Sequence, residues 1–196
     1  MNPLKEKLKN YRIILGSRSP RRKHLLEELD LLFEVIVKEV DESFPEDLNL
    51  ADVAQFLAEK KATAFAQLAA IPNTMIITAD SVVCIDNQIL NKPIDESDAH
   101  KMLKLLSGRK HIVITGVCIK CNQMSVSFSS RTDVHFKVLS DQEINYYVEK
   151  FKPLDKAGAY GIQEWIGFIG VQTINGSYTN VMGLPVNDLY EQLMKF

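Results

Sequence analysis

Cationic and hydroxyl side chains follow a short apolar segment near the start of the chain. Arg12–Leu15 is predicted to form a buried strand, Gly16–Ser19 interrupts it, and Pro20 is typical of the first position of a helix. The cations of Arg21–Lys23 then fall in the first turn, where the positive end of the helix dipole disfavours each by roughly a few tenths of a kcal/mol. This pattern indicates an anion site built from backbone N–H groups, hydroxyls and guanidinium groups. A solvated basic helix end is the alternative that these residues leave open.

Asp80 is the sharpest single candidate for chemistry. It follows the β-rich run 75–79, which we expect to end there, and apolar character resumes at 82–85. An unpaired buried carboxylate is costly, so Asp80 must cap a turn, pair with a cation or bind a metal.

Other polar residues give weaker signals. Glu42, taken alone, is typical of a solvated loop carboxylate, and Lys61 of a surface charge on a helix. Lys92 precedes Pro93 in a rigid extended segment that would hold its ammonium in place. The loop 155–163 carries two glycines, as close approach of a ligand requires, although an ordinary tight connection looks similar.

Alternating strand and helix patterns predict a mixed α/β protein that positions these residues. The predicted strands cover 12–15, 33–37, 75–79, 82–85, 111–120 and 125–138, the last two joined by a turn at 121–123. The predicted helices cover 20–29, 50–70, 97–106 and 140–150, with a final helix ending near Lys195. Asn175-Gly176 predicts a hairpin between 171–174 and 177–179. With no linker or repeat, we expect one compact domain over residues 1–196. Whether this domain has two lobes with a cleft between them is left open.

Composition excludes several classes of protein. The 196 residues are 46% hydrophobic and 24% charged, and the net charge of −2 argues against broad nucleic-acid binding. No apolar run predicts a membrane span or signal peptide, so we expect a cytoplasmic protein. Cys118 and Cys121 have C-x-x-C spacing, but on a strand they would point to opposite faces, which disfavours zinc.

Several segments together resemble the Maf family of nucleoside triphosphate pyrophosphatases. They occur in order along nearly the whole chain, at 16–22, 79–83, 91–93, 106–108, 155–163, 175–178 and 183–185. The Gly-Ala-Tyr-Gly-Ile-Gln sequence ending at Gln163 is similar to the subgroup acting on dTTP and UTP. Arg18 stands where the family often has a small residue, and Ser81 where Thr is commoner, but neither departure removes a catalytic group.

The resemblance implies both a fold and an activity. The implied fold is a mixed, elongated, twisted sheet flanked by helices, with two lobes and a central cleft, of the Maf and ITPase-like type. The implied reaction hydrolyses a nucleoside triphosphate to the monophosphate and pyrophosphate with Mg²⁺ or Mn²⁺. The implied catalytic residue is Asp80, which with Glu42 would hold the metal. The implied phosphate-binding residues are Ser17, Arg22, Lys61 and Lys92, and the implied base-specificity residues are Arg21, Ser81 and Gln163.

This chemistry suits the residue types. The lysines and arginines of the implied site could balance the roughly four negative charges of a triphosphate. Asp80 would orient or deprotonate the attacking water, directly or through the metal, and both options stay open. The Gln163 amide offers one donor and one acceptor, which match O4 and N3–H of uracil or thymine. An amide free to flip would also suit cytosine, so base selectivity requires a neighbour that fixes its orientation.

Two other functions compete with the pyrophosphatase. One is a nucleotide-binding regulator of septum formation and cell division without essential turnover, which the family's historical link with septum formation suggests. The other is a phosphatase acting on a different phosphorylated metabolite, which would release orthophosphate. For both the pyrophosphatase and the nucleotide-binding regulator, the expected partner is a nucleoside triphosphate. Whether the protein forms a homodimer is left open.

Overall fold

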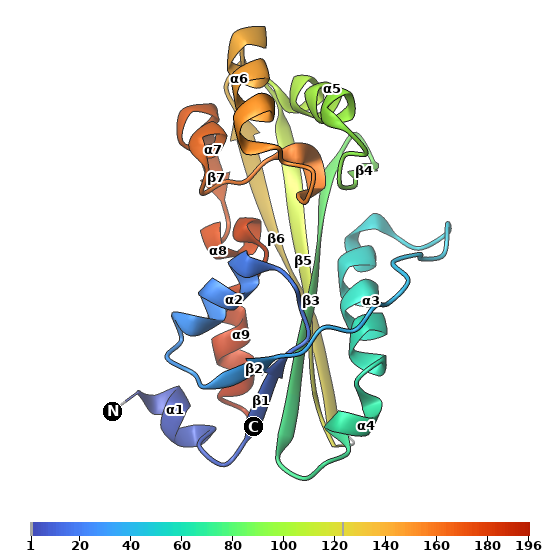
Figure 1. The fold of residues 1–196 in the computed structure, drawn as a ribbon, viewed down its shortest axis with the longest axis vertical. Helices are drawn as coiled ribbons and strands as arrows, with labels where there is room; N and C mark the ends of the chain where they lie inside the picture. The colour runs from blue at the N-terminus through green and yellow to red at the C-terminus, as the bar shows by residue number, and fades with distance from the viewer. Residues whose placement is uncertain (1, 123) are drawn as a thin grey trace. The chain divides into compact units, whose positions relative to one another are not determined.

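Two compact units, formed by interleaved segments, make up the chain. The computed structural model describes residues 2–122 and 124–196 (Figure 1). The first unit comprises residues 1–80, 115–130 and 183–196, and the second comprises 81–114 and 131–182. The chain therefore passes between the units within three of its strands, at residues 80–81, 114–115 and 130–131.

Seven strands form one mixed sheet. They are β1 (Arg12–Leu15), β2 (Phe33–Val35), β3 (Thr74–Ile85), β4 (Gln88–Leu90), β5 (Lys110–Cys121), β6 (Met124–Phe136) and β7 (Val171–Asn175). The order is β2-β1-β3-β5-β6-β7, with β4 paired to β3. β1 pairs in parallel with β2 and β3, whereas β3–β4 and β6–β7 are antiparallel. The predicted mixed α/β class is confirmed.

Helices flank the strands of each unit. The first unit holds α1 (Pro3–Lys7), α2 (Pro20–Glu27), α3 (Leu50–Thr63), α4 (Ala66–Ala69) and α9 (Val186–Leu193). The second holds α5 (Glu96–Leu106), α6 (Asp141–Phe151), the 3₁₀ turn η1 (Ala157–Ala159), α7 (Trp165–Gly170) and α8 (Tyr178–Met182). In the first unit, α2 and α9 lie on one side of the strands and α3 on the other (Figure 1). None of the helices among the described residues is long and apolar enough to cross a membrane.

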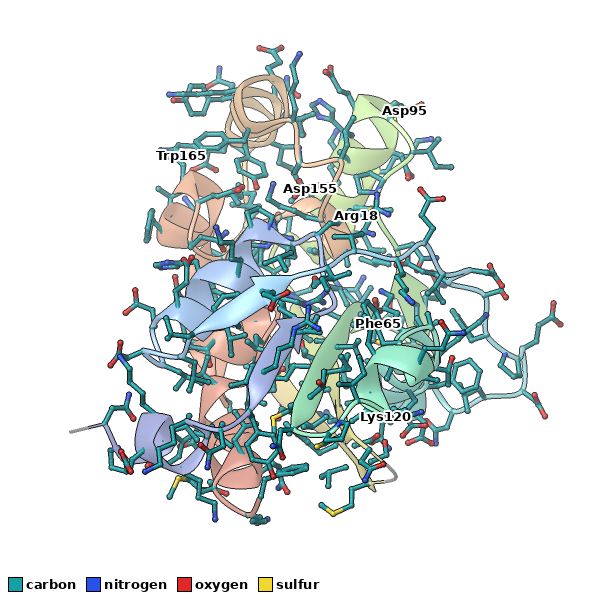
Figure 2. The ribbon with its side chains drawn as sticks, turned by 60° about the horizontal axis from the view of Figure 1, so that its bottom comes forward. Arg18, Phe65, Asp95, Lys120, Asp155 and Trp165 are labelled. Atoms are coloured by element: carbon teal, nitrogen blue, oxygen red, sulfur yellow. The ribbon has the colours of Figure 1, made fainter. Side chains whose placement is uncertain are left out.

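The predicted strand–loop–helix unit at the start of the chain is confirmed. Ser19 caps α2 by accepting a hydrogen bond from the Arg22 backbone N–H, and Pro20 occupies the first helical position. A Cβ atom at Gly16 would come within 2.9 Å of the Phe65 and Thr78 side chains, so the bend after β1 requires glycine. Phe65, labelled in Figure 2, packs with Ile14 and Ile76 in the core of the first unit.

The second unit has its own apolar core. Leu103 of α5, Tyr147 of α6 and Phe136 of β6 are fully buried in it. A capping box at Ser140 begins α6: Ser140 Oγ accepts from the Glu143 N–H, and the Glu143 carboxylate accepts from the Ser140 N–H. α5 packs against both α6 and η1, and α5 and α6 lie beside each other (Figure 1).

Two sequence-based boundaries are wrong. β3 does not end at Asp80 but continues through it to Ile85, because Asp80 is paired, as described below. The predicted helix over 50–70 divides into α3 and α4. The predicted turn at 121–123 includes Gln123, which lies outside the described residues.

The predicted hairpin at Asn175-Gly176 does not form. β7 ends at Asn175 and pairs with β6, whereas Tyr178–Met182 is helix α8. The reason is local, since Ser177 Oγ accepts from the Asn180 N–H at 3.3 Å and so begins a helix. The Ser177 N–H in turn donates to Thr132 Oγ1 on β6 at 3.0 Å.

Candidate functional site

An ammonium group lies between two carboxylates in the first unit. Lys61 Nζ contacts Glu42 Oε1 at 2.8 Å and forms a second ion pair with Asp80 Oδ1. The side chains of Lys61 and Asp80 are only 16% and 13% exposed, whereas Glu42 is 48% exposed. The prediction that Lys61 is a surface charge was wrong, and the structure brings together three residues that the family resemblance implicates. Of the three options for Asp80, pairing with a cation is the one observed.

The Lys61–Asp80 ion pair forms because one face of β3 lies against α3. Side chains two residues apart on a strand share a face, so Thr78 and Asp80 both point towards α3. Thr78 Oγ1 donates to the Ala58 carbonyl at 2.7 Å, and Lys61 lies three residues further along the same helix. Ser81 lies on the opposite face of β3 from Asp80.

Arg22 is fixed by two hydrogen bonds within the first unit. Its Nε donates to the Gly183 carbonyl at 2.8 Å, and its Nη1 donates to Ser17 Oγ at 3.4 Å. Ser17 is buried and also accepts from the Ser19 N–H at 3.2 Å. The Gly183-Leu184-Pro185 motif therefore holds the arginine that the anion hypothesis requires. The role of Gly183 could not be found from sequence, because this contact spans 161 residues.

Electrostatics link Arg22 to the carboxylate pair. Burial lowers the pKa of the Arg22 guanidinium, and the neighbouring charge of Arg21 lowers it further. The Asp80 and Glu42 carboxylates act in the opposite direction and raise this pKa. The first unit thus contains a set of cations and carboxylates close enough to influence one another.

Three predicted residues belong to the second unit. Ser81 is on β3, Lys92 is exposed in the segment after β4, and Gln163 immediately precedes Glu164 at the start of α7. The Gln163 Oε1 atom is buried and has no hydrogen-bond partner among the described residues. A buried acceptor of this kind is costly, and it suits a site that receives a donor from a ligand. That these residues converge on one substrate with those of the first unit stays a prediction.

The loop 155–163 is anchored to the segment that carries Lys92. The Gly158 N–H donates to the Asn91 carbonyl at 3.2 Å. Gly158 has φ +68°, and a Cβ atom there would come within 3.0 Å of Val83. Glycine is therefore required at this position both for its backbone conformation and for the close approach to β3. Figure 2 labels Asp155, the first residue of this loop, and Trp165, the first residue of α7, which follows the loop.

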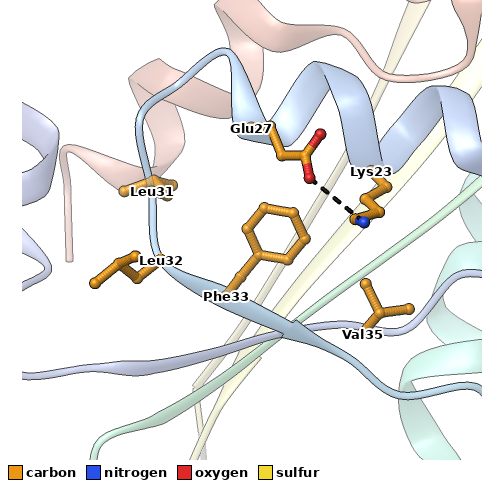
Figure 3. A pocket seen from close by; sticks show the side chains of 6 residues that line it. All are labelled: Lys23, Glu27, Leu31, Leu32, Phe33 and Val35. Carbon is orange, nitrogen blue, oxygen red and sulfur yellow. Dashed lines mark ion pairs between the residues drawn. The ribbon is translucent and has the colours of Figure 1, made fainter.

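Two other features do not contribute to the site. A hollow of about 510 Å³ lies on the first unit, and none of the predicted site residues lines it. Figure 3 shows the side chains that do. Lys23 lies at the margin of this hollow, 3.5 Å from Glu27. Cys84 and Cys118 are buried free cysteines, and Cys121 is partly buried.

His111 packs beneath the loop in the second unit. Its Nε2 and the Tyr160 hydroxyl share a hydrogen bond of 2.8 Å, and its ring meets Phe136 and Tyr160 edge to face. Burial, assisted by the charge of His135, lowers the pKa of His111 to about 4. Burial also raises the pKa of Tyr160, so the pair is neutral at pH 7.

We expect acid to destabilise the protein through His111. The unfolded chain binds this proton with a pKa of about 6.5 and the folded chain with a pKa of about 4, so stability falls as pH falls through this window. For His111→Gln, the loss of unfolding free energy between pH 7.5 and 5.0, measured by urea denaturation, should be smaller than for the wild type by about 2 kcal/mol. Glutamine retains a hydrogen-bonding group for Tyr160, and other titrating groups cancel in the comparison. Equal losses in the two proteins would contradict the assignment.

Comparison with known proteins defines the class. The family model described as "Maf-like protein" matches residues 12–196. A dTTP/UTP pyrophosphatase of Parabacteroides distasonis is 48% identical over 192 residues, covering 97% of this chain and 99% of the relative. That of Phocaeicola vulgatus is 50% identical over 191 residues, covering 97% and 98%. The structure of a HAM1 protein from Coxiella burnetii has a TM-score of 0.52 at 14% identity, covers 95% of this chain and 100% of that one, and shows a shared fold alone.

These matches confirm the predicted class of nucleotide pyrophosphatase, a hydrolase. The chain belongs to the Maf family. Its resemblance at seven separate motifs therefore reflects similarity over nearly the full length.

Proposed function

We propose that this protein hydrolyses dTTP and UTP, and modified pyrimidine nucleotides, to the nucleoside monophosphate and pyrophosphate with Mg²⁺ or Mn²⁺. The observation that carries the proposal is Lys61 held between Asp80 and Glu42, beside an Arg22 fixed by Ser17 and Gly183. Relatives that are about half identical and named dTTP/UTP pyrophosphatase support the choice of substrate.

The donor set of the first unit fits a hard divalent cation. Oxygens of Asp80 and Glu42 already converge on one cation, the Lys61 ammonium. No cluster of three His, Cys, Asp or Glu side chains suitable for a metal occurs in the described part of the chain. The two carboxylates suit Mg²⁺, which usually takes one or two protein carboxylates and completes its shell with substrate phosphates and water. When bound by Asp80 and Glu42, the metal would neutralise phosphate charge and polarise the phosphorus centre.

Four side chains of this protein have separate roles in the proposed reaction. The Arg22 guanidinium, oriented by Gly183 and Ser17, would bind phosphate oxygens through charge-assisted hydrogen bonds. The Lys61 ammonium can exchange a carboxylate partner for a phosphate oxygen, since both are anionic oxygen acceptors. The Asp80 carboxylate would then orient the attacking water and accept its proton. Lys92 would neutralise the pyrophosphate as it leaves.

Base recognition belongs to Gln163 in this proposal. Its buried Oε1 acceptor would receive the N3–H of uracil or thymine, and its amide N–H would donate to O4. Cytosine presents an acceptor at N3, which would leave Oε1 without a donor. Arg21 and Ser81 are the other proposed specificity residues.

The proposal includes a cellular setting. We propose one catalytic domain over residues 1–196, since the family model spans segments of both units. It acts in the cytoplasm, where the nucleoside triphosphate pool lies, and removes nucleotides in a house-cleaning role. The net charge of −2 supports action on free nucleotides instead of nucleic acid.

A nucleotide panel with product identification tests the proposal. The purified protein is incubated with canonical and modified nucleoside triphosphates and Mg²⁺ or Mn²⁺, and the products are separated by ion-exchange chromatography. We expect monophosphate and pyrophosphate in equal amounts, with dTTP and UTP preferred over CTP. Orthophosphate as the first product would contradict the proposal, and tight binding without products would favour a regulator.

A further inference from the structure

The structure contains a network of polar side chains beside Gln163 that the reaction itself does not use. Glu164, the next residue, is 20% exposed, and its Oε1 lies 3.2 Å from Lys156 Nζ. Its Oε2 accepts a hydrogen bond from the Tyr147 hydroxyl. Lys156 and Tyr147 therefore both bind the carboxylate of Glu164, the residue immediately before helix α7.

Tyr147 connects the rigid core to this loop at two points. Its ring is fully buried on α6 and stacks on Phe151. Its hydroxyl donates to Glu164 and accepts from the Gly161 N–H at 3.1 Å, so both its donor and its acceptor capacity are used. These two contacts flank Ile162 and Gln163, and they fix the backbone on each side of the Gln163 amide.

Lys156 closes the other end of the loop. Its side chain is only 8% exposed, and Nζ lies 2.6 Å from Asp155 Oδ1 as well as 3.2 Å from Glu164. An ammonium with this little exposure is costly unless it is paired, and of its two ion pairs the one with Glu164 joins the two ends of the loop. The backbone adds support, since the Glu164 N–H donates to the Gly161 carbonyl at 3.0 Å.

We propose that Tyr147, Glu164 and Lys156 form a positioning network that orients Gln163 and thereby sets base discrimination. This inference rests on the proposed function. The network contacts Gly161 and Glu164, on either side of Gln163, and so holds the loop that carries the amide; a loop that shifts would let Gln163 adapt to cytosine. In this proposal the three residues act through Gln163 and not on the phosphates or the attacking water. Their loss should therefore affect discrimination far more than turnover.

Tyr147→Phe is the sharpest test, because it removes the hydroxyl and keeps the buried ring. We expect the ratio of kcat/KM for UTP over CTP to fall about tenfold, while kcat on UTP changes less than about threefold. Tyr146→Phe is the matched control, since Tyr146 is its neighbour on α6, is 42% exposed, and accepts from Lys150. It should leave the ratio unchanged. Glu164→Gln provides a second variant if Tyr147→Phe does not fold.

Two further comparisons separate positioning from a general structural role. Adding Tyr147→Phe to Gln163→Ala should cause no further loss of discrimination, because the network acts through Gln163. Lys156→Met should lose discrimination, and Lys156→Arg should restore part of it.

The outcomes distinguish this inference from the function on which it rests. An unchanged UTP-to-CTP ratio in Tyr147→Phe, or equal losses on all nucleotides, would overturn the inference and leave the pyrophosphatase intact. A further loss in the double variant would overturn it as well. A wild-type protein that releases no pyrophosphate from any nucleotide would overturn both.

Discussion

Asp80→Asn is expected to fold normally and to lose roughly a hundredfold or more of its turnover. Asparagine has the size of aspartate but no negative charge, so it cannot accept a proton from water or neutralise a cation. The fold should survive because Lys61 keeps its second carboxylate partner, Glu42, at 2.8 Å. Turnover is measured as pyrophosphate released from saturating UTP, and folding as the thermal midpoint.

A neighbouring ion pair offers a matched control for this experiment. Asp41 pairs with Lys60 at 3.0 Å, one residue before Glu42 and Lys61 in each segment. Asp41 is exposed and lies outside the proposed site, so Asp41→Asn should keep turnover within about twofold. If Asp80→Asn were as active as Asp41→Asn, the carboxylate of Asp80 would have no part in the reaction.

Arg22→Ala should lower kcat/KM for the nucleotide more than the loss of any other cation on α2. Charge-assisted hydrogen bonds contribute roughly 1.5–3 kcal/mol each, so we expect kcat/KM to fall by about tenfold to a hundredfold. The replacement Arg22→Lys retains the charge but lacks the planar fork that binds Gly183 and Ser17, and it should recover only a minor part. Steady-state kinetics on dTTP provide the measurement.

Lys23→Ala removes the same charge from the adjacent position. Lys23 is exposed and pairs with Glu27 at 3.5 Å, so its loss should change kcat/KM less than about twofold. Equal effects of Arg22→Ala and Lys23→Ala would show that only the general charge of this helix matters. Thermal unfolding of both variants separates lost binding from lost structure, since Arg22 also satisfies a buried carbonyl.

Features specified by neighbouring residues could be predicted from the sequence. The cap at Ser19, the proline at the first position of α2 and the capping box of α6 each depend on side chains within four residues. The motif order also identified the family, because the motifs are highly specific when taken together, although each alone is weak.

Features specified by distant partners could not be predicted. The sequence placed a strand end at Asp80, since a carboxylate in a buried run normally terminates it, but Lys61 from α3 satisfies that charge and the strand continues. Likewise, Asn175-Gly176 has the residues of a hairpin turn. Ser177 instead hydrogen-bonds to Thr132 and Asn180, and a helix begins there. Lys61 looked like a surface charge because helix periodicity does not show which strand it faces.

The hydrogen bond between Arg22 and Gly183 also bears on when the protein becomes active during its synthesis. The two residues are 161 positions apart, which a ribosome adding about 5–20 residues per second covers in roughly 8–30 s. The arginine is thus made well before its carbonyl partner. A nascent chain that has not yet reached Gly183 would lack this contact, and nucleotide hydrolysis that depends on an oriented Arg22 would begin only after Gly183 has been added and has packed against α2.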